Sequence, residues 1–320
     1  MKKISCVIPC YRSENTIGVV AERIVKTIEK DGRYDYEIIC VNDYSPDGTM
    51  KTLRNLAKNN PKIKVVNLSR NFGQHGAVMA GFHYVTGDII VCMDDDGENP
   101  PENMFMLVDK LDEGYDWATA KYVEEKRSPI RSLGTKISFE MSTRLVGKPR
   151  DVDINSYSAF KRFIADEVIK YENPYPFVHG LMLRVTRNIA NVEMPRAQRL
   201  EGGSGYTMKK LLSLWMNGFT AFSEKPLRVA SYVGVSASVV GIISGIVVVV
   251  RKIMMPDIAA GYSSMMAVLL FLFGIIMMFM GMLGEYIGRM YISINNAPQF
   301  VVRETLNMDG DNNDEESTNS

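Results

Sequence analysis

Three consecutive carboxylates, Asp94, Asp95 and Asp96, follow an apolar run that reads as a buried strand. Adjacent acids repel one another, and sheltering them from water without a partner is costly. A divalent cation resolves the repulsion, since Mg²⁺ typically takes one or two carboxylates and completes its shell with water and phosphate oxygens. In an extended segment alternate residues point the same way, so Asp94 and Asp96 can face one ligand while Asp95 points elsewhere. Taken alone, the triplet fits either a metal-binding Asp-x-Asp motif or a solvated acidic turn.

The segment before this triplet alternates strand-like and helical patterns. Four short, β-branched, nearly continuous apolar runs are expected to be strands: Ile4 to Pro9, Tyr36 to Asn42, Ile63 to Leu68 and Asp88 to Met93. Strands buried on both faces and joined by helical crossovers indicate a mostly parallel sheet covered by helices, which is an α/β fold.

In such sheets ligands bind beyond the carboxyl ends of the strands. Three polar segments fall at those ends, PCYRSEN, NDYSPDGT and DDDGENPPE, and the pattern predicts that they converge on one site. Neither GxGxxG nor GxxxxGK[ST] occurs in the sequence, so a dinucleotide-binding fold or a P-loop has no support.

Composition excludes some classes of function. Lys+Arg and Asp+Glu are equal at 37 each, so the charge balance gives no reason to expect nucleic acid as a partner. The cysteines lie in or beside apolar, strand-like runs without a CxxC pair, which indicates buried free thiols in a reducing compartment. The 3 His residues have no metal-ligand spacing, and structural or surface roles are expected for them.

Two long uncharged runs lie in the C-terminal third, at Val229 to Val250 and at Tyr262 to Gly284. Each exceeds the roughly 20 residues that cross a bilayer core, so we expect two transmembrane helices, with a pair of buried core helices as the alternative. The linker between them is too short to be a domain, so both ends of the chain should lie on one side of the membrane. Lys and Arg occur both in the flanks and in this linker, and their distribution does not settle the orientation.

The segment before the first span, YTMKKLLSLWMNGFTAF, has apolar residues at helical spacing around Trp215. This pattern favours an amphipathic helix in the membrane interface, with packing on the soluble domain as the alternative. The tail from Thr305 carries five acids and no base, TLNMDGDNNDEESTNS, and is expected to be disordered.

With these motifs in order, the sequence resembles the family-two glycosyltransferases with a GT-A fold. Among them it is similar to the membrane-anchored enzymes that act on polyprenyl phosphates: dolichyl-phosphate mannose synthase, bacterial undecaprenyl-phosphate glucosyltransferases and the formamido-arabinose transferase. The resemblance runs from about Ile4 to Val302 and rests on IPCYRSENTI, VNDYSPDGT, LSRNFGQHGAVMAGF, MDDDGENPPE, RLEGGSGY, the two-span hydropathy and GEYIGRMY. Each motif is loose by itself, and their order and spacing together are specific.

The resemblance implies a role for particular residues on the donor side. Pro9, Tyr11 and Glu14 would form the first nucleotide-binding loop, and Asp43 would contact the base or ribose. Asp94 would lie near the sugar nucleotide.

The resemblance also implies a metal and an acceptor site. Asp96 would ligate Mg²⁺ or Mn²⁺, and Arg199 would contact phosphate as part of the pattern R-x-x-G-x-S-K-[YW]. The residues assigned to the lipid phosphate are Lys121, Arg127, Arg131 and Ser204.

Three departures from the family pattern concern substrate contacts. Gly205 stands where Lys is usual, Gly97 and Glu98 replace a common Leu-Gln, and Asn42 replaces a frequent Asp. The Asp-x-Asp pair is intact, so we interpret these differences as substrate tuning rather than loss of activity.

The resulting domain assignment has five parts. They are 1–204, a GT-A catalytic domain; 205–228, a juxtamembrane amphipathic segment; 229–284, a two-helix transmembrane anchor; 285–304, a second juxtamembrane segment; and 305–320, the acidic tail.

The activity that the resemblance implies is inverting transfer of a sugar from a nucleoside-diphosphate sugar to polyprenyl (undecaprenyl) phosphate, for cell-envelope glycosylation. A UDP-sugar is favoured over a GDP-sugar, and the catalytic domain would face the cytoplasm from the inner (cytoplasmic) membrane. Homo-oligomers are common among such relatives, although no motif here demonstrates one. Two alternatives stay open: a polysaccharide synthase, whose larger channel and QxxRW-type motif are missing, and a non-enzymatic membrane scaffold that keeps the GT-A fold.

Overall fold

The computed structural model describes most of the chain. The described residues are 1–122, 149, 152–195, 197, 200, 232–236, 239, 241, 243, 246–247, 250–251, 253–254, 261–294 and 297–308. The chain separates into two compact units, one formed by Met1–Tyr206 with Ala297–Ser320 and the other by Thr207–Asn296.

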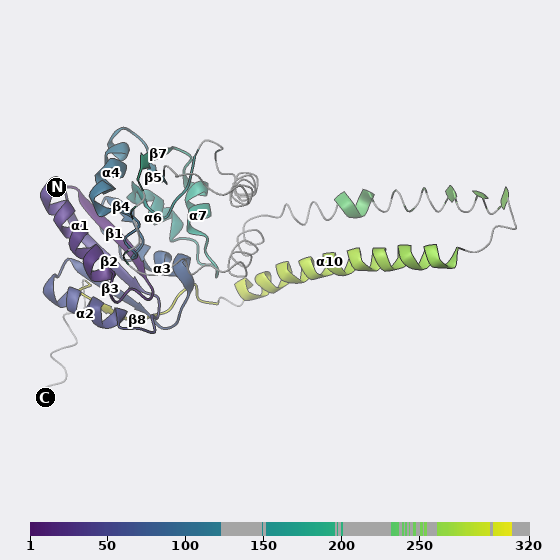
Figure 1. Ribbon diagram of the computed structural model, residues 1–320, viewed down its shortest axis with the longest axis horizontal. Coiled ribbons are helices and arrows are strands. Elements are labelled where there is room, and N and C mark those ends of the chain that lie inside the picture. Colours follow the sequence, from purple (N-terminus) through teal and green to yellow (C-terminus); the bar gives the residue numbers. More distant parts are fainter. Residues whose placement is uncertain are drawn as a thin grey trace, which may run out of the picture. The chain divides into compact units, whose positions relative to one another are not determined.

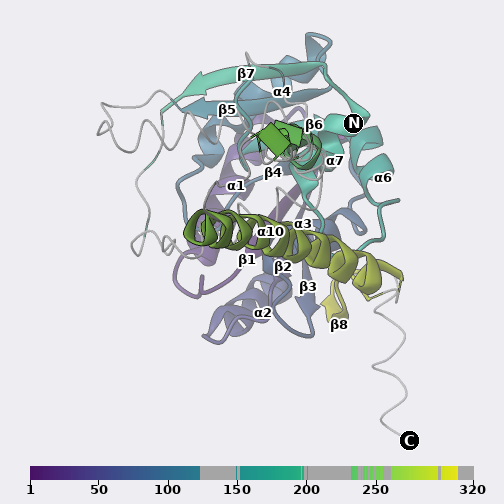
Figure 2. The same ribbon diagram turned by 90° about the vertical axis from the view of Figure 1, so that its right-hand side faces the viewer.

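The first unit is built on a sheet that, among the described residues, has the order β7-β5-β6-β4-β1-β2-β3-β8, seen from one edge to the other in Figure 2. Its strands are β1 (Lys3–Cys10), β2 (Asp35–Asn42), β3 (Ile63–Leu68), β4 (Ile89–Cys92), β5 (Trp117–Tyr122), β6 (Ser158–Lys161), β7 (Ile189–Met194) and β8 (Val302–Leu306). The four central strands are parallel to one another, β6 is antiparallel to β4 and β5, and β7 is parallel to β5. The mostly parallel sheet predicted from the sequence is confirmed, and β1 to β4 coincide with the four expected runs.

Helices cover both faces of this sheet (Figure 1). The helices of the unit are α1 (Ile17–Asp31), α2 (Thr49–Asn59), α3 (Gly73–Phe82), the short 3-10 helix η1 (Pro101–Asn103), α4 (Met104–Asp112), α6 (Arg162–Val168) and α7 (Val178–Val185). α1, α2 and α4 pack on one face, and α3, α6 and α7 pack on the other. The unit is therefore a three-layer α/β structure with the carboxyl ends of the central strands at one edge.

Side-chain alternation in β1 assigns the two faces. Cys6 and Ile8 belong to the core beneath α1, whose Ile24 and Ile28 lie on the same buried stripe. The helix ends at Gly32, whose φ of 70 gives the left-handed C-cap that glycine adopts without strain.

The opposite face of β1 lies directly against α3. A Cβ on Gly81 would be 2.6 Å from Val7 Cγ1 and 3.2 Å from Val41 Cγ2, so glycine lets this helix approach the sheet closely. The same packing fixes the start of α3 beside the carboxyl edge of the sheet. The expectation of buried free thiols is confirmed, because Cys6, Cys10, Cys40 and Cys92 are all free and buried.

The C-terminal boundary differs from the sequence-based expectation. Residues 285–304 were expected to be juxtamembrane and the chain from Thr305 disordered, whereas Val302–Leu306 form β8, antiparallel to β3. Glu304 also accepts hydrogen bonds from Arg54 Nη2 at 2.6 and 2.8 Å and from Asn67 Nδ2 at 2.7 Å. A polar strand at the edge of a sheet is held by its backbone hydrogen bonds and by side-chain contacts of this kind. Neither can be read from the composition of the segment, so the sequence did not indicate this strand. Residues 309–320 lie outside the described residues.

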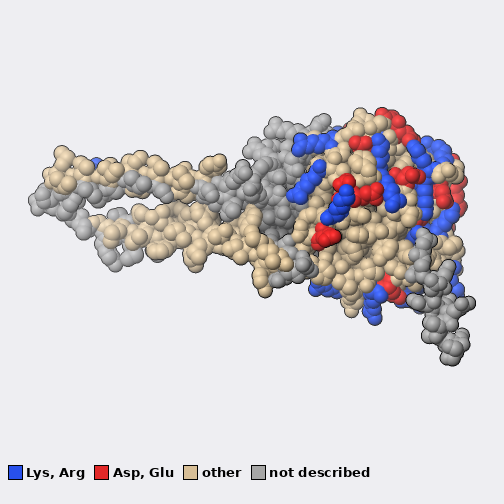
Figure 3. Space-filling model, turned by 180° about the vertical axis from the view of Figure 1, so that it is seen from behind, with Lys and Arg blue, Asp and Glu red and all other residues tan. Residues whose placement is uncertain are grey.

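The second unit contains α10 (Tyr262–Ile294), a helix of 33 residues. Its stretch Phe271–Gly288 is apolar and long enough to cross a membrane, and none of it is buried in the structure. Phe271 and Met277 are each 69% exposed, and on the face shown in Figure 3 the Lys, Arg, Asp and Glu side chains gather on the first unit. Within the described part of the chain this is one candidate span, at the position of the second expected span. The first, residues 229–250, is described only in part, and the expected amphipathic helix around Trp215 lies outside the described residues.

Candidate active site

The segments that follow β1, β2 and β4 meet at the carboxyl edge of the sheet. The backbone N–H of Asp43 donates to Cys10 O at 3.0 Å, which joins the ends of β2 and β1. The backbone N–H of Tyr11 donates to Asp95 Oδ2 at 3.0 Å, which joins the end of β1 to the acid loop, residues 94–99. The polar segments that the sequence assigned to one edge therefore contact one another.

The three predicted nucleotide-loop residues, Pro9, Tyr11 and Glu14, each have structural contacts at this edge. Pro9 lies in β1 opposite Val41 of β2, and the side chain of Tyr11 is 44% exposed at the edge of the sheet. Glu14 Oε2 accepts the backbone N–H of Gly48 at 2.6 Å, so this carboxylate ties the loop after β1 to the start of α2. The contacts of these residues with a nucleotide stay predictions.

Asp94 is held by donors from two different elements. Its Oδ1 accepts Gln74 Nε2 at 2.8 Å from the first turn of α3, and its Oδ2 accepts Ser156 Oγ at 2.6 Å from the segment before β6. Its backbone N–H donates to Asn99 Oδ1 at 2.7 Å, and Asn99 is only 2% exposed. The carboxylate of Asp94 is therefore fixed in orientation by partners on α3 and on the segment before β6.

Asp96 occupies a tight turn. Its Oδ1 accepts the backbone N–H of Glu98 at 2.9 Å, and its carbonyl oxygen accepts the N–H of Leu200 at 3.0 Å. Gly97 follows with a φ of 79, and a Cβ there would lie 2.7 Å from Leu200 Cγ. The departure from the family pattern at Gly97 thus has a local reason, because a larger residue would be strained in this turn and would clash with Leu200.

Asp95 faces the loop after β1, as the alternation of an extended segment predicts. Burial raises its pKa to about 6; the hydrogen bond from the Tyr11 N–H opposes this rise, and the charges of Asp94 and Asp96 add to it. Burial of Asp95 and the nearby charges of Asp94 and Asp96 therefore all favour its protonated form.

The donor set of this loop fits Mg²⁺ or Mn²⁺. Both metals prefer hard oxygen ligands, and Mg²⁺ needs only one or two carboxylates when phosphate and water complete its shell. Among the described residues no group of three or more His, Cys, Asp or Glu is arranged to hold a metal by itself. Asp96, with Asp94 beside it, fits the sparser kind of site that a bound diphosphate completes.

Asp43 has a contact that the sequence did not reveal. It is 3% exposed, and its two carboxylate oxygens accept the backbone N–H groups of Phe72 at 2.7 Å and Gly73 at 2.9 Å. Burial raises its pKa in spite of these two bonds. Asp43 thereby fixes the start of α3, and α3 carries Gln74; its predicted contact with a base or ribose stays a prediction.

The acceptor-side predictions are only partly covered by the described residues. Lys121, in β5, forms an ion pair with Glu193 of β7, with 3.2 Å between Nζ and Oε1, and its side chain is 43% exposed. The next residue, Tyr122, accepts Asn99 Nδ2 through its hydroxyl at 2.8 Å, which links the end of β5 to the acid loop. The remaining predicted residues, Arg127, Arg131, Arg199 and Ser204, lie outside the described residues.

Sequence reasoning missed three residues that hold the acid loop: Gln74, Asn99 and Ser156. Gln74 and Asn99 stand inside motifs that were already noted, LSRNFGQHGAVMAGF and MDDDGENPPE, where a polar residue beside the site could have been singled out. Ser156 is separated from Asp94 by 62 positions, and no local pattern indicates their contact.

Comparison with known proteins agrees with this architecture. Residues 5–169 match the family model for glycosyl transferase family 2, and residues 225–290 match the model for the GtrB C-terminal hairpin. The chain is 32% identical over 309 residues to the uncharacterized glycosyltransferase YkcC of Bacillus subtilis (strain 168), covering 95% of this chain and 94% of that protein. It is 31% identical over 320 residues to the undecaprenyl-phosphate 4-deoxy-4-formamido-L-arabinose transferase of Proteus mirabilis (strain HI4320), covering 99% and 98% of the two chains.

Solved structures share the fold at low identity. The mannosyl-3-phosphoglycerate synthase of Rubrobacter xylanophilus aligns with a TM-score of 0.53 and 17% identity over 68% of this chain and 71% of that one. The glucosyl-3-phosphoglycerate synthase of Mycobacterium tuberculosis, in complex with Mn²⁺ and UDP-glucose, aligns with a TM-score of 0.51 and 22% identity over 67% and 75%.

Proposed function

The chain belongs to glycosyl transferase family 2, and from this we propose that it transfers a sugar from a nucleoside-diphosphate sugar to undecaprenyl phosphate. The product is a lipid-linked sugar monophosphate for the cell envelope. The observation that carries the chemistry is the acid loop, in which Asp94 and Asp96 lie at the carboxyl edge beside the loop after β1. The substrate class rests on the relatives named as undecaprenyl-phosphate transferases, which match nearly the full chain.

On the donor side, Asp96 is the proposed ligand of Mg²⁺ or Mn²⁺, with Asp94 next to the sugar nucleotide. Such a metal, when bound, neutralises charge that develops on the departing nucleoside diphosphate. The hydrogen bonds from Gln74 and Ser156 keep Asp94 in one orientation before substrate arrives. We favour a UDP-sugar as donor, and the Mycobacterium tuberculosis structure with Mn²⁺ and UDP-glucose is an example of this fold with that pair of ligands.

On the acceptor side, the nucleophile is an oxygen of the lipid phosphate. With a second pKa near 6 this phosphate is largely dianionic at neutral pH, so it needs positioning more than a general base. The cations proposed to position it are Lys121, Arg127, Arg131 and Arg199, with Ser204 as a hydroxyl donor. The phosphate oxygen bonds to the anomeric carbon as the bond to the diphosphate breaks, which inverts the configuration and releases the nucleoside diphosphate.

Two membrane spans follow from the connectivity of the chain if α10 crosses the bilayer. β8 pairs with β3, so the chain leaves the first unit at Tyr206 and rejoins it at Ala297. A single crossing would leave β8 on the opposite side from β3. The stretch 207–261 must then supply a second crossing, as the uncharged run at 229–250 would. We propose that the first unit faces the cytoplasm from the inner membrane, where nucleotide sugars are available.

The proposal is tested with the purified full chain in detergent. Radiolabelled UDP- and GDP-sugars are offered with undecaprenyl phosphate and Mn²⁺, with and without EDTA. We expect EDTA-sensitive label in the lipid phase, and we expect Asp96→Asn to fold normally but lose transfer. Asp35→Asn is a matched control, because Asp35 forms an exposed ion pair with Lys62 at the amino end of β2.

The possible outcomes separate the competing functions. Near-normal transfer by Asp96→Asn would refute the metal assignment. If no donor sugar is transferred and the chain binds neither UDP nor GDP, the enzyme proposal fails and a non-enzymatic scaffold with this fold takes its place.

A further inference from the structure

Tyr44, the residue after Asp43, has a backbone conformation that its side chain does not favour. Its φ is 52, in the left-handed region that glycine adopts without strain and that bulky residues rarely enter. The side chain is 52% exposed, and among the described residues its ring has no aromatic or cationic partner. Core packing therefore does not explain why a large aromatic residue occupies this position.

The residues on either side of Tyr44 hold it in this conformation. Asp43 is bonded to the start of α3 through its carboxylate and to Cys10 through its N–H. Ser45 accepts the N–H of Arg12 through Oγ at 2.7 Å and donates from Oγ to Asp47 Oδ1 at 2.5 Å. Strained residues persist where the surrounding structure over-determines them, and they cluster at ligand sites.

The strand order places Tyr44 at a useful distance from the acid loop. β4, β1 and β2 are neighbours in that order, so the loop after β2 lies two strand spacings from the loop after β4, about 10 Å along the edge of the sheet. A nucleoside diphosphate whose phosphates lie at Asp96 must extend its nucleoside along this edge or away from it. The loop after β1, with Tyr11 exposed on it, lies between the two.

We propose that Tyr44 is a nucleobase-binding residue whose ring stacks on the base of the donor nucleotide. This role rests on the proposed function and adds to it a residue that holds the base. Asp43, bonded to Cys10 and to the start of α3, holds the loop that carries this ring and acts as a positioning residue. Stacking uses the π face that every base has, so the ring supplies affinity for the nucleoside more than choice between bases.

The test compares Tyr44→Gly and Tyr44→Phe with the parent, using the full chain in detergent. Glycine removes the ring and also relieves the backbone strain, so we expect the thermal midpoint of Tyr44→Gly to equal or exceed that of the parent. We expect its Kd for UDP with Mn²⁺, measured by calorimetry, to rise about tenfold, as loss of base stacking implies. Tyr44→Phe keeps the ring, and its Kd should stay within about twofold of the parent.

Two controls separate base stacking from other effects. Inorganic diphosphate has no base, so its Kd should be the same for the parent and Tyr44→Gly. Tyr175 is also an exposed tyrosine with left-handed backbone, with a φ of 61, but it lies in the loop between α6 and α7. Tyr175→Gly should therefore relieve similar strain and leave the Kd for UDP unchanged.

The results separate the role of Tyr44 from the proposed function. An unchanged Kd for UDP in Tyr44→Gly would overturn the role of Tyr44 alone, and so would an equal loss of affinity for inorganic diphosphate. If the parent binds neither UDP nor GDP, the proposed function falls and this role falls with it.

Discussion

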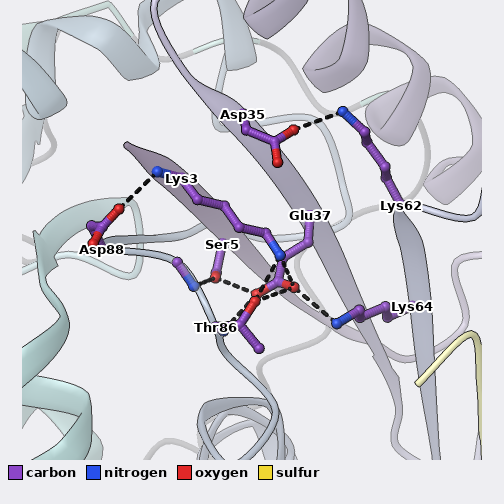
Figure 4. Close-up of polar contacts among 9 residues, drawn as sticks. Lys3, Ser5, Asp35, Glu37, Lys62, Lys64, Thr86 and Asp88 are labelled. Atoms are coloured by element: carbon purple, nitrogen blue, oxygen red, sulfur yellow. Dashed lines mark hydrogen bonds and ion pairs between the residues drawn. The ribbon is translucent and has the colours of Figure 1, made fainter. Parts of the chain in front are cut away.

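Glu37 is a buried carboxylate whose replacement should change the acid stability of the first unit. It is 1% exposed in β2 and accepts hydrogen bonds from Lys3 Nζ at 2.9 Å, Ser5 Oγ at 2.5 Å and the Thr86 N–H at 2.6 Å, with Lys64 Nζ at 3.0 Å (Figure 4). Glu37→Gln removes the charge and keeps the shape. We expect it to lower the free energy of unfolding near pH 7 and to match the parent more closely as the pH falls.

The magnitude follows from the pKa of the carboxyl group. Burial by itself would raise the pKa of Glu37, but the hydrogen bonds from Ser5, Lys3, Thr86 and Lys64 outweigh it and lower the pKa from 4.5 to about 2. Because the pKa is lower in the folded chain, the stabilisation is fully present above pH 4.5 and is lost as the pH falls toward 2. A shift of this size corresponds to about 3 kcal/mol, and solvent screening around the partly exposed Lys3 reduces it to about 2 kcal/mol.

The assay is urea unfolding of the full chain in detergent at several values between pH 7 and pH 2. Trp117 is fully buried in β5 and provides the fluorescence signal. The control is Asp35→Asn, because both members of the Asp35–Lys62 pair are 47% exposed and such pairs contribute about 1 kcal/mol or less. A difference between Glu37→Gln and the parent that stays constant across this pH range would refute the reasoning.

Three further predictions concern packing, the acid loop and the edge strand. Gly81→Val should lower the free energy of unfolding by about 1–3 kcal/mol in urea, because even a Cβ there lies 2.6 Å from Val7 Cγ1. Gln74→Met should lower turnover about tenfold by removing a hydrogen bond to the charged Asp94, with little change in unfolding, since Gln74 is exposed. Glu304→Gln should speed hydrogen exchange of the β8 amides, because it weakens side-chain contacts that hold this strand to the sheet.

Each of these has an outcome that would contradict it. Unchanged stability of Gly81→Val would mean that α3 is not in close contact with β1. Unchanged turnover of Gln74→Met would show that the orientation of Asp94 does not depend on this amide. If the β8 amides of Glu304→Gln exchange as slowly as those of the parent, the backbone hydrogen bonds alone account for the stability of this strand.

The parts of the fold that follow from local pattern were accessible from the sequence. β1 to β4 are buried on both faces, so each is a short apolar run between polar segments, and their parallel order implies a shared carboxyl edge. β8 could not be found in this way. Its sequence, VRETL, is mostly polar, and its partner β3 lies far earlier in the chain.

The candidate site also has parts that the sequence indicates and parts that depend on the tertiary structure. The acid triplet could be recognised because like charges after a buried strand need a reason, and Asp95 does point away from its neighbours. The supports of Asp94 could not be derived, because Ser156 reaches it from a distant segment and an exposed glutamine such as Gln74 carries no periodic signal. Asp43 was interpreted from its motif, while its bonds to the Phe72 and Gly73 amides depend on tertiary structure.

The pairing of β8 with β3 also sets an order of events during synthesis. β3 has emerged from the ribosome roughly 230 residues before β8, and the apolar segment α10 lies between them. At about 5–20 residues per second, the outer edge of β3 stays unpaired for roughly 10–50 s of translation. An unpaired edge can recruit other strands and aggregate. We therefore expect the nascent chain to depend on chaperones until that last strand arrives.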